Sequence, residues 1–173
     1  MIRFAVIGLG PMGRTHLATL LAQDAAAVTA VCDTDPDRLD GPLAPGGANL
    51  DTGVDAASAG PLRRTADAAD IFADNDVDAV VIATPSDLHA ELACRALSSG
   101  KHVFCEKPMA LNVDDCDRML AAARAADRRL MIGHVMRFWA EWSAAAGAVR
   151  SGRYGRLRAL HLRRYCEVPG GGR

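Results

Sequence analysis

The chain has 173 residues, of which 50% are hydrophobic and 24% are charged. This length and apolar content suffice for one complete domain with a buried core and for part of a second domain. The formal net charge of −1 argues against bulk attraction to nucleic acid or to an anionic membrane, and no apolar run is long enough to span a bilayer.

The five cysteines are odd in number and form no C-x-x-C pair. Most of them lie within apolar runs, which is typical of buried thiols in a reducing compartment and not of a disulfide framework or a zinc site. The amino terminus begins directly with a strand pattern, so no secretory signal is predicted. We therefore expect a cytoplasmic protein without a metal site.

The first predicted element is a buried strand from Phe4 to Ile7 that ends in a glycine-rich turn. Gly8, Gly10 and Gly13 have the spacing G-x-G-x-x-G, and apolar residues recur after them at helical spacing. In this context Gly8 permits the turn, Gly10 lets the backbone approach a pyrophosphate, and Gly13 lets the helix pack onto the strand. The pattern predicts a dinucleotide-binding site, and the alternative is a tight turn that binds nothing.

The helix after the turn begins at Pro11, which loses no useful N–H donor in that position. Its free N–H groups and positive dipole end would face the phosphates. A second strand, Val28 to Cys32, ends at Asp33. An acid at this distance from the glycine turn is expected to hold the adenosine ribose hydroxyls.

Asp33 and Arg38 point to different cofactors, NAD and NADP. The carboxylate of Asp33 would repel a 2′-phosphate and so favours NAD. Asp35 can cap a short helix with Pro36 at its first position, which places Arg38 near the site of the adenine or of a 2′-phosphate. Arg38 leaves NADP open, and a solvated helix arginine explains it equally well.

The middle of the chain mixes a long irregular run with further elements. The run from Gly41 to Pro61 has no convincing period, and we predict a surface loop or a partly disordered insertion. A helix capped by Thr65 is predicted over Thr65 to Asp74. A buried strand follows from Asp78 to Thr84, and then a helix from Asp87 to Ser99 that Gly100 closes.

Two further strands, His102 to Cys105 and Leu130 to Ile132, flank a helix from Asn112 to Ala126 that Asn112 caps. The alternation of strands and helices predicts an α/β fold with a parallel, doubly wound sheet. Ligands bind beyond the carboxyl ends of the strands in such sheets. The residues expected at that edge are Asp33, Thr84, Lys107 and His134.

Two elements are predicted near the carboxyl end. They are a helix from Trp139 to Ser151 and a strand from Leu157 to Tyr165 that would open a second sheet. We therefore expect an NAD(P)-binding domain over residues 1–133 and the beginning of a second domain over residues 134–173. The arginines from Arg124 onward are interspersed with Leu, Ala and Tyr, so we interpret them as solvated faces and not as a nucleic-acid surface.

Four motifs in the chain resemble those of a known family. Starting at Gly8, Ala83, Gly100 and Arg137, they read Gly-Leu-Gly-Pro-Met-Gly-Arg-Thr-His, Ala-Thr-Pro-Ser-Asp-Leu-His, Gly-Lys-His-Val-Phe-Cys-Glu-Lys-Pro and Arg-Phe. In this order they resemble the Gfo/Idh/MocA family, the glucose–fructose oxidoreductases, inositol dehydrogenases and rhizopine catabolism proteins. The Glu-Lys-Pro motif is the most specific of them and argues against an unrelated Rossmann enzyme.

The resemblance implies an NAD(P)-dependent oxidoreductase. Such an enzyme transfers a hydride between a nicotinamide cofactor and a hydroxyl-bearing carbon of a sugar, cyclitol or related polyol. The resemblance also implies a Rossmann domain followed by an α/β domain with a large open sheet. That second domain carries the oligomer interface in the family, so the full-length form is expected to be a homo-oligomer.

The resemblance further implies a role for each motif residue. The pyrophosphate loop would comprise Gly8, Gly10, Pro11, Met12 and Gly13, with Asp33 on the adenosine ribose and Arg38 near the adenine. The nicotinamide half would be bordered by Thr84, Pro85 and His89. Glu106 and Lys107 would meet the nicotinamide ribose and the substrate, and Arg137 would lie near the cofactor or the substrate. Lys107 would orient the substrate hydroxyl and stabilise alkoxide character while a histidine takes the proton.

The chain departs from the family pattern at three places. Ser86 replaces an asparagine that is frequent in the family, and the run from Gly41 to Pro61 replaces a compact helix and short strand. The family continues after a glycine-rich segment like Gly170–Gly172 with Asp-x-x-x-His, which completes its active site. We therefore expect a truncated form that binds NAD with negligible turnover, and a stand-alone dinucleotide-binding module is the alternative. His16, His134 and His161 are expected to be packed or solvated.

Overall fold

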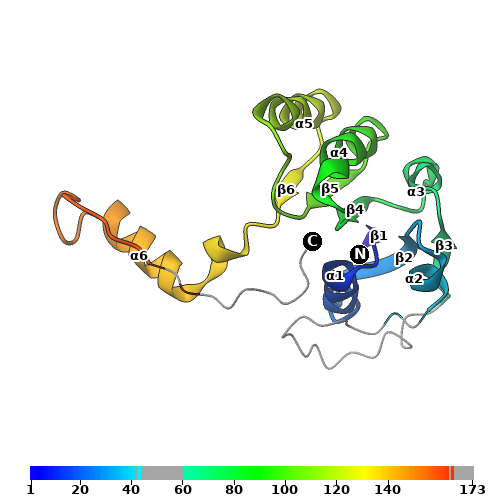
Figure 1. Cartoon of the computed structure of the whole chain (residues 1–173), viewed down its shortest axis with the longest axis horizontal. Helices are drawn as coiled ribbons and strands as arrows, with labels where there is room; N and C mark the ends of the chain where they lie inside the picture. The colour runs from blue at the N-terminus through cyan, green and yellow to red at the C-terminus, as the bar shows by residue number, and fades with distance from the viewer. Residues whose placement is uncertain (42, 44–60, 164, 166–173) are drawn as a thin grey trace. The chain divides into compact units, whose positions relative to one another are not determined.

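The computed structural model describes residues 1–41, 43, 61–163 and 165 (Figure 1). The chain divides into two compact units, Met1–His134 and Val135–Arg173. Each unit is described by itself below. The assignment of the second unit to a substrate domain stays a prediction.

The first unit contains one parallel sheet of six strands. The strands are β1 (Ile2–Ile7), β2 (Ala26–Cys32), β3 (Arg63–Thr65), β4 (Ala79–Ile82), β5 (His102–Cys105) and β6 (Leu130–Ile132). Their order in the sheet is β3-β2-β1-β4-β5-β6 (Figure 1). This is the strand order of a doubly wound dinucleotide-binding fold, so the predicted fold class is confirmed.

The register of the strands brings their carboxyl ends into one row. Ile7 of β1 pairs with Cys32 of β2 and with Ile82 of β4. Ile82 pairs in turn with Cys105 of β5, which pairs with Ile132 of β6. The segments that follow these strands therefore leave the sheet at the same edge.

Helices cover both faces of the sheet (Figure 1). Helices α1 (Pro11–Leu21) and α2 (Pro36–Asp40) pack on the face that includes Val6 and Val31. Helices α3 (Ala68–Ala73), α4 (His89–Ser98) and α5 (Val113–Ala126) pack on the opposite face. Because successive strand residues point to opposite faces, the near-continuous apolar strands fill two separate cores.

Several predicted helix ends are confirmed. The side chain of Asp35 accepts a hydrogen bond from the backbone N–H of Asp37 at 3.0 Å, and Asn112 caps α5 by accepting from Asp115 N–H at 2.8 Å. Gly100 follows α4 with a φ of +79°, a value that favours glycine. The helix predicted from Asp87 to Ser99 is confirmed as α4 (His89–Ser98), which a 3₁₀ turn, η2 (Ser86–Leu88), directly precedes.

The predicted helix from Thr65 begins later than expected. Thr65 is the last residue of β3, where it pairs with Cys32, and its hydroxyl bonds to the Asp70 carboxylate. Asp67 caps α3 instead and accepts from Ala69 N–H at 2.8 Å. The three-residue strand β3 was missed because its pairing with β2 is a tertiary contact that leaves no apolar run in the sequence.

The second unit confirms one predicted element and contradicts another. It contains a 3₁₀ turn, η3 (Val135–Phe138), and the predicted helix as α6 (Ala140–Arg150). The predicted strand from Leu157 to Tyr165 is wrong, because its described residues form no strand and expose Leu160 and Leu162. Alternating apolar residues form a strand only where a neighbouring backbone pairs with them, and the described part of the chain offers no such neighbour.

Two sequence predictions lie largely or wholly outside the described residues. They are the loop from Gly41 to Pro61 and the glycine-rich segment Gly170–Gly172. Among the helices that the structure describes, none combines the length and the apolar character needed to cross a membrane.

A bidentate ion pair joins the amino-terminal ends of β1 and β4. Arg3 Nε and Nη2 donate to the two carboxylate oxygens of Asp78 at 3.0 and 2.8 Å, and the backbone N–H of Arg3 donates to the same group at 2.9 Å. These hydrogen bonds hold the pKa of Asp78 well below its usual range. Asp76 adds a more exposed contact to Arg3 at 2.7 Å.

The lowered pKa of Asp78 predicts acid sensitivity. Its stabilising effect is fully present above the ordinary aspartate pKa of about 3.9 and is lost as the pH falls below that value. We expect Asp78→Asn to reduce the free energy of unfolding at neutral pH. Between about pH 4 and pH 2 the variant should lose less of this free energy than the parent does. Urea unfolding followed by circular dichroism measures both effects. The matched variant Asp76→Asn should change little, and equal acid profiles for Asp78→Asn and the parent would contradict the assignment.

Candidate functional site

A cleft of about 690 Å³ lies at the carboxyl edge of the sheet in the first unit. Its walls come from the glycine turn after β1, the segment after β2 and the segment after β4. The predicted site residues that line it are Gly8, Gly10, Pro11, Met12, Asp33, Arg38, Thr84 and Pro85. The structure thus brings together residues from three separate segments that were predicted from the sequence to bind one ligand.

The glycine turn is shaped by two close approaches of backbone. Gly8 has a φ of +93°, and a Cβ on it would lie 2.7 Å from the carbonyl oxygen of Ala83. A Cβ on Gly13 would lie 1.7 Å from the carbonyl oxygen of Gly8, so Gly13 supports the turn from behind. A Cβ on Gly10 would meet nothing within 4 Å. Gly10 therefore leaves open space at the place where the cleft begins.

Asp33 ties the glycine turn to the end of β2. Its buried carboxylate accepts hydrogen bonds from the backbone N–H of Leu9 at 2.6 Å and of Asp35 at 2.9 Å. Arg38, which is half exposed, places Nε 3.2 Å from Asp35 and Nη1 3.9 Å from Asp33. The guanidinium charge is thus balanced by two carboxylates in the same wall of the cleft.

The cleft contains an unsatisfied hydroxyl. Thr84 Oγ1 is buried and has no hydrogen-bond partner among the described residues. A buried polar group without a partner costs roughly 1–3 kcal/mol. Helix α1 opens onto the same cleft without a side-chain cap. An anionic ligand with further polar groups, such as a dinucleotide, would satisfy both features.

A second polar cluster lies where β5 ends. It includes His16, which is packed as expected but has a hydrogen-bonding role that the sequence did not predict. His16 Nε2 lies 2.8 Å from Glu106 Oε1, and the backbone N–H of Lys107 donates to Glu106 Oε2 at 3.0 Å. The ring of His16 packs edge-on against Phe104. The sequence signal that could have found His16 is its position one helical turn after Gly13, on the helix face that packs against the sheet.

Glu106 is an ionised carboxylate with its hydrogen bonds already made. Burial raises its pKa, but the hydrogen bonds from His16 and from Lys107 N–H, with the charges of both side chains, bring the pKa below its usual value. A Cβ on Gly133 would lie only 3.1 Å from Glu106 Oε1, so Gly133 makes room for this carboxylate.

His89 is buried and directs both ring nitrogens at backbone carbonyls. Nδ1 lies 2.7 Å from the carbonyl oxygen of Pro108, and Nε2 lies 3.0 Å from that of Thr84. A neutral imidazole donates from one nitrogen at a time, so only one of these contacts carries the proton in that state. In this structure His89 joins the segments after β4 and β5 and is not among the side chains that line the cleft.

Lys107 is exposed at the end of β5, in a segment with a cis bond to Pro108. Its ammonium group makes no hydrogen bond or ion pair within the described part of the chain. Lys107, Glu106, Gly13 and His89 border the same sheet edge without being lining residues of the cleft. His134 also follows a strand, β6, at this edge.

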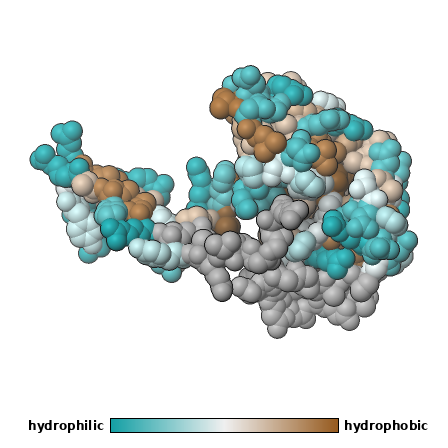
Figure 2. All heavy atoms as spheres, viewed as in Figure 1, coloured by the Kyte–Doolittle hydropathy of each residue, from teal (hydrophilic) through white to brown (hydrophobic). Residues whose placement is uncertain are grey.

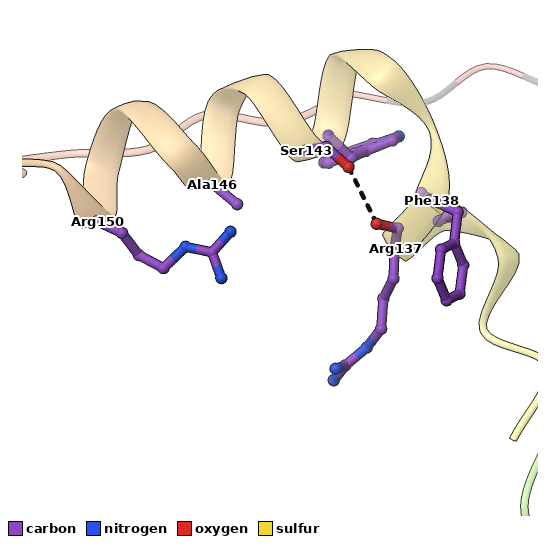
Figure 3. A pocket seen from close by; sticks show the side chains of 7 residues that line it. Arg137, Phe138, Ser143, Ala146 and Arg150 are labelled. Atoms are coloured by element: carbon purple, nitrogen blue, oxygen red, sulfur yellow. Dashed lines mark hydrogen bonds between the residues drawn. The ribbon is translucent and has the colours of Figure 1, made fainter. Parts of the chain in front are cut away.

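Arg137 belongs to the second unit. It lines a hollow of about 570 Å³ beside α6, in which Ser143 Oγ donates to the carbonyl oxygen of Arg137 at 3.1 Å (Figure 3). Arg150 and Phe138 border the same hollow, and hydrophobic residues form part of the surface over α6 (Figure 2). The predicted contact of Arg137 with the cofactor or substrate stays a prediction.

The cysteines near the site are inert thiols. Burial, with the neighbouring Asp33 charge, raises the pKa of Cys32 to about 11, and burial with Glu106 raises the pKa of Cys105 to about 12. Neither is a thiolate at neutral pH. Within the part of the chain that the structure describes, no group of three or more His, Cys, Asp or Glu side chains could hold a metal ion.

Residues 2–134 match the GFO_IDH_MocA family, described as an oxidoreductase family with an NAD-binding Rossmann fold. A dehydrogenase of 1-carboxy-3-chloro-3,4-dihydroxycyclohexa-1,5-diene from Comamonas testosteroni is 37% identical over 96% of this chain. The myo-inositol 2-dehydrogenase of Thermotoga maritima is 33% identical over 93% of it. The chain spans 38% and 44% of the lengths of these two relatives.

A solved structure has the same fold. The WlbA dehydrogenase from Bordetella pertussis, crystallised with NADH and UDP-GlcNAcA, superimposes with a TM-score of 0.76 at 32% identity. The match covers 90% of this chain and 41% of the WlbA chain. As with the two relatives, the likeness covers less than half of the longer protein.

The close approach at Gly13 predicts a difference between two glycine variants. We expect Gly13→Ala to lower the free energy of unfolding by about 2 kcal/mol or more, because its Cβ would overlap the Gly8 carbonyl. Gly10→Ala should cost about 1 kcal/mol or less, since its Cβ enters open space. Urea titration of both variants measures these values. Equal stabilities would show that the turn can relax around Gly13.

Proposed function

The chain belongs to the Gfo/Idh/MocA oxidoreductase family with an NAD-binding Rossmann fold, and from this premise we propose that it serves hydride transfer between NAD and a hydroxyl-bearing carbon of a sugar, cyclitol or related polyol. The observation that carries the proposal is the meeting of the dinucleotide cleft and the Glu106–Lys107 segment at one sheet edge. The names of the relatives as cyclitol and carbocycle dehydrogenases support the substrate class.

The residues of the cleft fit the cofactor. The open side of Gly10 and the uncapped start of α1 suit a pyrophosphate, and the unpaired Thr84 hydroxyl suits a polar group further along the ligand. When bound, the nicotinamide ring accepts or gives up the hydride. The protein's part is to hold the cofactor and to position the substrate hydroxyl.

Asp33 and Arg38 together favour NAD. Asp33 lines the cleft with a carboxylate that can accept from ribose hydroxyls and that repels a 2′-phosphate. Arg38 is the group that could attract such a phosphate, but Asp33 and Asp35 already lie within 4 Å of its guanidinium. NADP binding would have to disturb this arrangement.

Lys107 is the side chain proposed to act on the substrate. An ammonium group offers three N–H donors and no acceptor, so it can orient a hydroxyl oxygen and stabilise alkoxide character on it. Its exposure and its lack of a partner in the described residues leave it available for this contact. Arg137 is proposed to contribute a second contact to the cofactor or substrate.

For the 173 residues by themselves we propose cofactor binding with negligible turnover. Lys107 is the one candidate catalytic side chain in the described part of the chain that matches a family motif, whereas removal of the hydroxyl proton needs a base as well. A dinucleotide-binding module without turnover is the alternative function. The hydrophobic residues on the surface over α6 support a homo-oligomer or domain interface in the second unit, and the buried thiols support a cytoplasmic location.

Substitution of Asp33 tests the cofactor assignment. We expect Asp33→Ser to weaken NADH binding about tenfold through loss of charged hydrogen bonds, and to weaken NADPH binding less because the repulsion disappears with the carboxylate. Isothermal titration calorimetry with both nucleotides gives the ratio of the two affinities. The matched variant Asp24→Asn, at an exposed position outside the cleft, should leave the ratio unchanged. A constant ratio in Asp33→Ser would remove Asp33 from nucleotide recognition.

Substitution of Lys107 tests the catalytic assignment. With NAD and a panel of cyclitols and sugars, we expect the 173-residue chain to bind nucleotide. We expect it to form no more NADH than its Lys107→Met variant forms. In a chimera of residues 1–134 with the remainder of the Thermotoga maritima myo-inositol 2-dehydrogenase, Lys107→Met should reduce turnover about 100-fold and leave NADH affinity within about twofold.

Either of two results would count against these expectations. Robust turnover by the 173-residue chain would refute the expected inactivity. A folded, NADH-binding chimera whose turnover is the same with and without the Lys107→Met substitution would refute the role of Lys107.

A further inference from the structure

A histidine of the nucleotide-binding helix reaches across the fold to the lysine segment. His16 lies in α1, and its Nε2 is 2.8 Å from Glu106 Oε1, across 90 residues of sequence. The His16 and Glu106 side chains are 21% and 11% exposed, so solvent competes little for this contact. A hydrogen bond to a largely buried carboxylate is among the stronger ones in proteins.

Apolar packing fixes the geometry of this contact. The His16 ring meets Phe104 edge-to-face, with ring centroids 5.0 Å apart and planes at 64°. On the side of β6, a Cβ on Gly133 would come within 3.2 Å of Phe104 and 3.1 Å of Glu106 Oε1. The ring and the carboxylate therefore have little room to move apart.

The two oxygens of Glu106 are used in different ways. Oε1 faces His16, and Oε2 accepts from the backbone N–H of Lys107 at 3.0 Å. The carboxylate is thus folded back over its own segment and makes no ion pair with the ammonium of Lys107 within the described residues. The Lys107 charge already acts on this carboxylate from the next residue along the chain. Without the contact to His16, Glu106 Oε1 is free to turn toward that ammonium.

We infer that His16 is a positioning residue, which holds Glu106 against α1 and so keeps the Lys107 ammonium available to a substrate hydroxyl. The inference rests on the proposed function for the role of Lys107, whereas the contact between His16 and Glu106 does not depend on that function. This contact also joins the two halves of the site, because the helix that begins at the glycine turn carries His16 one turn later.

The lysine content of the chain allows a direct test. The sequence contains two lysines, Lys101 and Lys107. Lys101 is buried and donates to the carbonyl oxygen of Val77 at 2.9 Å, whereas Lys107 is exposed. Competitive acetylation with a trace amount of acetic anhydride, read by peptide mass spectrometry, therefore reports on each lysine separately, with the exposed amino group of Met1 as internal reference.

We expect His16→Leu to slow acetylation of Lys107 about threefold or more, because a released Glu106 carboxylate pairs with the ammonium and reduces its reactive neutral form. His16→Gln should restore the parent rate, since its amide nitrogen can donate where Nε2 does. Lys101 and Met1 should react at the same rates in all three proteins. A purely structural role for His16 would change the stability without this selective effect.

Two further variants keep the test decisive. His102→Gln replaces a histidine at the opposite end of β5 and should leave the Lys107 rate unchanged. If His16→Leu does not fold, Gly133→Ala displaces the same carboxylate from the side of β6 and should slow Lys107 acetylation in the same way. An unchanged Lys107 rate in a folded His16→Leu or Gly133→Ala protein would overturn the inference.

The measurement needs neither cofactor nor substrate. A protein that fails to bind NADH would contradict the proposed function and would still report on the contact between His16 and Glu106. A protein that binds NADH but shows no selective change at Lys107 would contradict the inference alone.

Discussion

The parallel pairing of β1 with β2 and β4, and of β4 with β5, ends four strands in one row, and every part of the candidate site depends on that row. Parallel strands need crossover helices, and these helices bury both faces of the sheet. The helices cover the faces of the sheet but not its carboxyl edge, where the chain leaves each strand. Asp33, Thr84 and Glu106 each follow one of these strands and meet at this edge because of the register.

Two close contacts hold the glycine turn in its conformation. Gly13 leaves no space for a side chain behind Gly8, and the Asp33 carboxylate accepts from Leu9 N–H in front of it. A preformed turn loses little conformational entropy on binding, which is an advantage for a phosphate site made of backbone groups. The one unsatisfied buried group in the cleft among the described residues is the Thr84 hydroxyl. It belongs to the segment after β4, whose backbone lies close against Gly8.

Two histidines connect the segments around the edge in different ways. His89 joins the carbonyls of Thr84 and Pro108 and so fixes the distance between the segments after β4 and β5. His16 joins the nucleotide-binding helix to Glu106. Two part-buried histidine contacts thus hold the segments on either side of the exposed Lys107, whose ammonium makes no hydrogen bond or ion pair within the described residues.

The sequence by itself determined the strand–turn–helix pattern, the caps at Asp35 and Asn112, the fold class and the family, because glycine spacing, capping residues and apolar periods are local signals. The tertiary structure alone decided what depends on a partner far along the chain. Strand β3 exists because it pairs with β2, and residues 157–163 form no strand because no described backbone pairs with them. The contact between His16 and Glu106 likewise spans 90 residues. The spacing from Gly13 places His16 on the packed face of α1, but only the folded chain brings Glu106 to it.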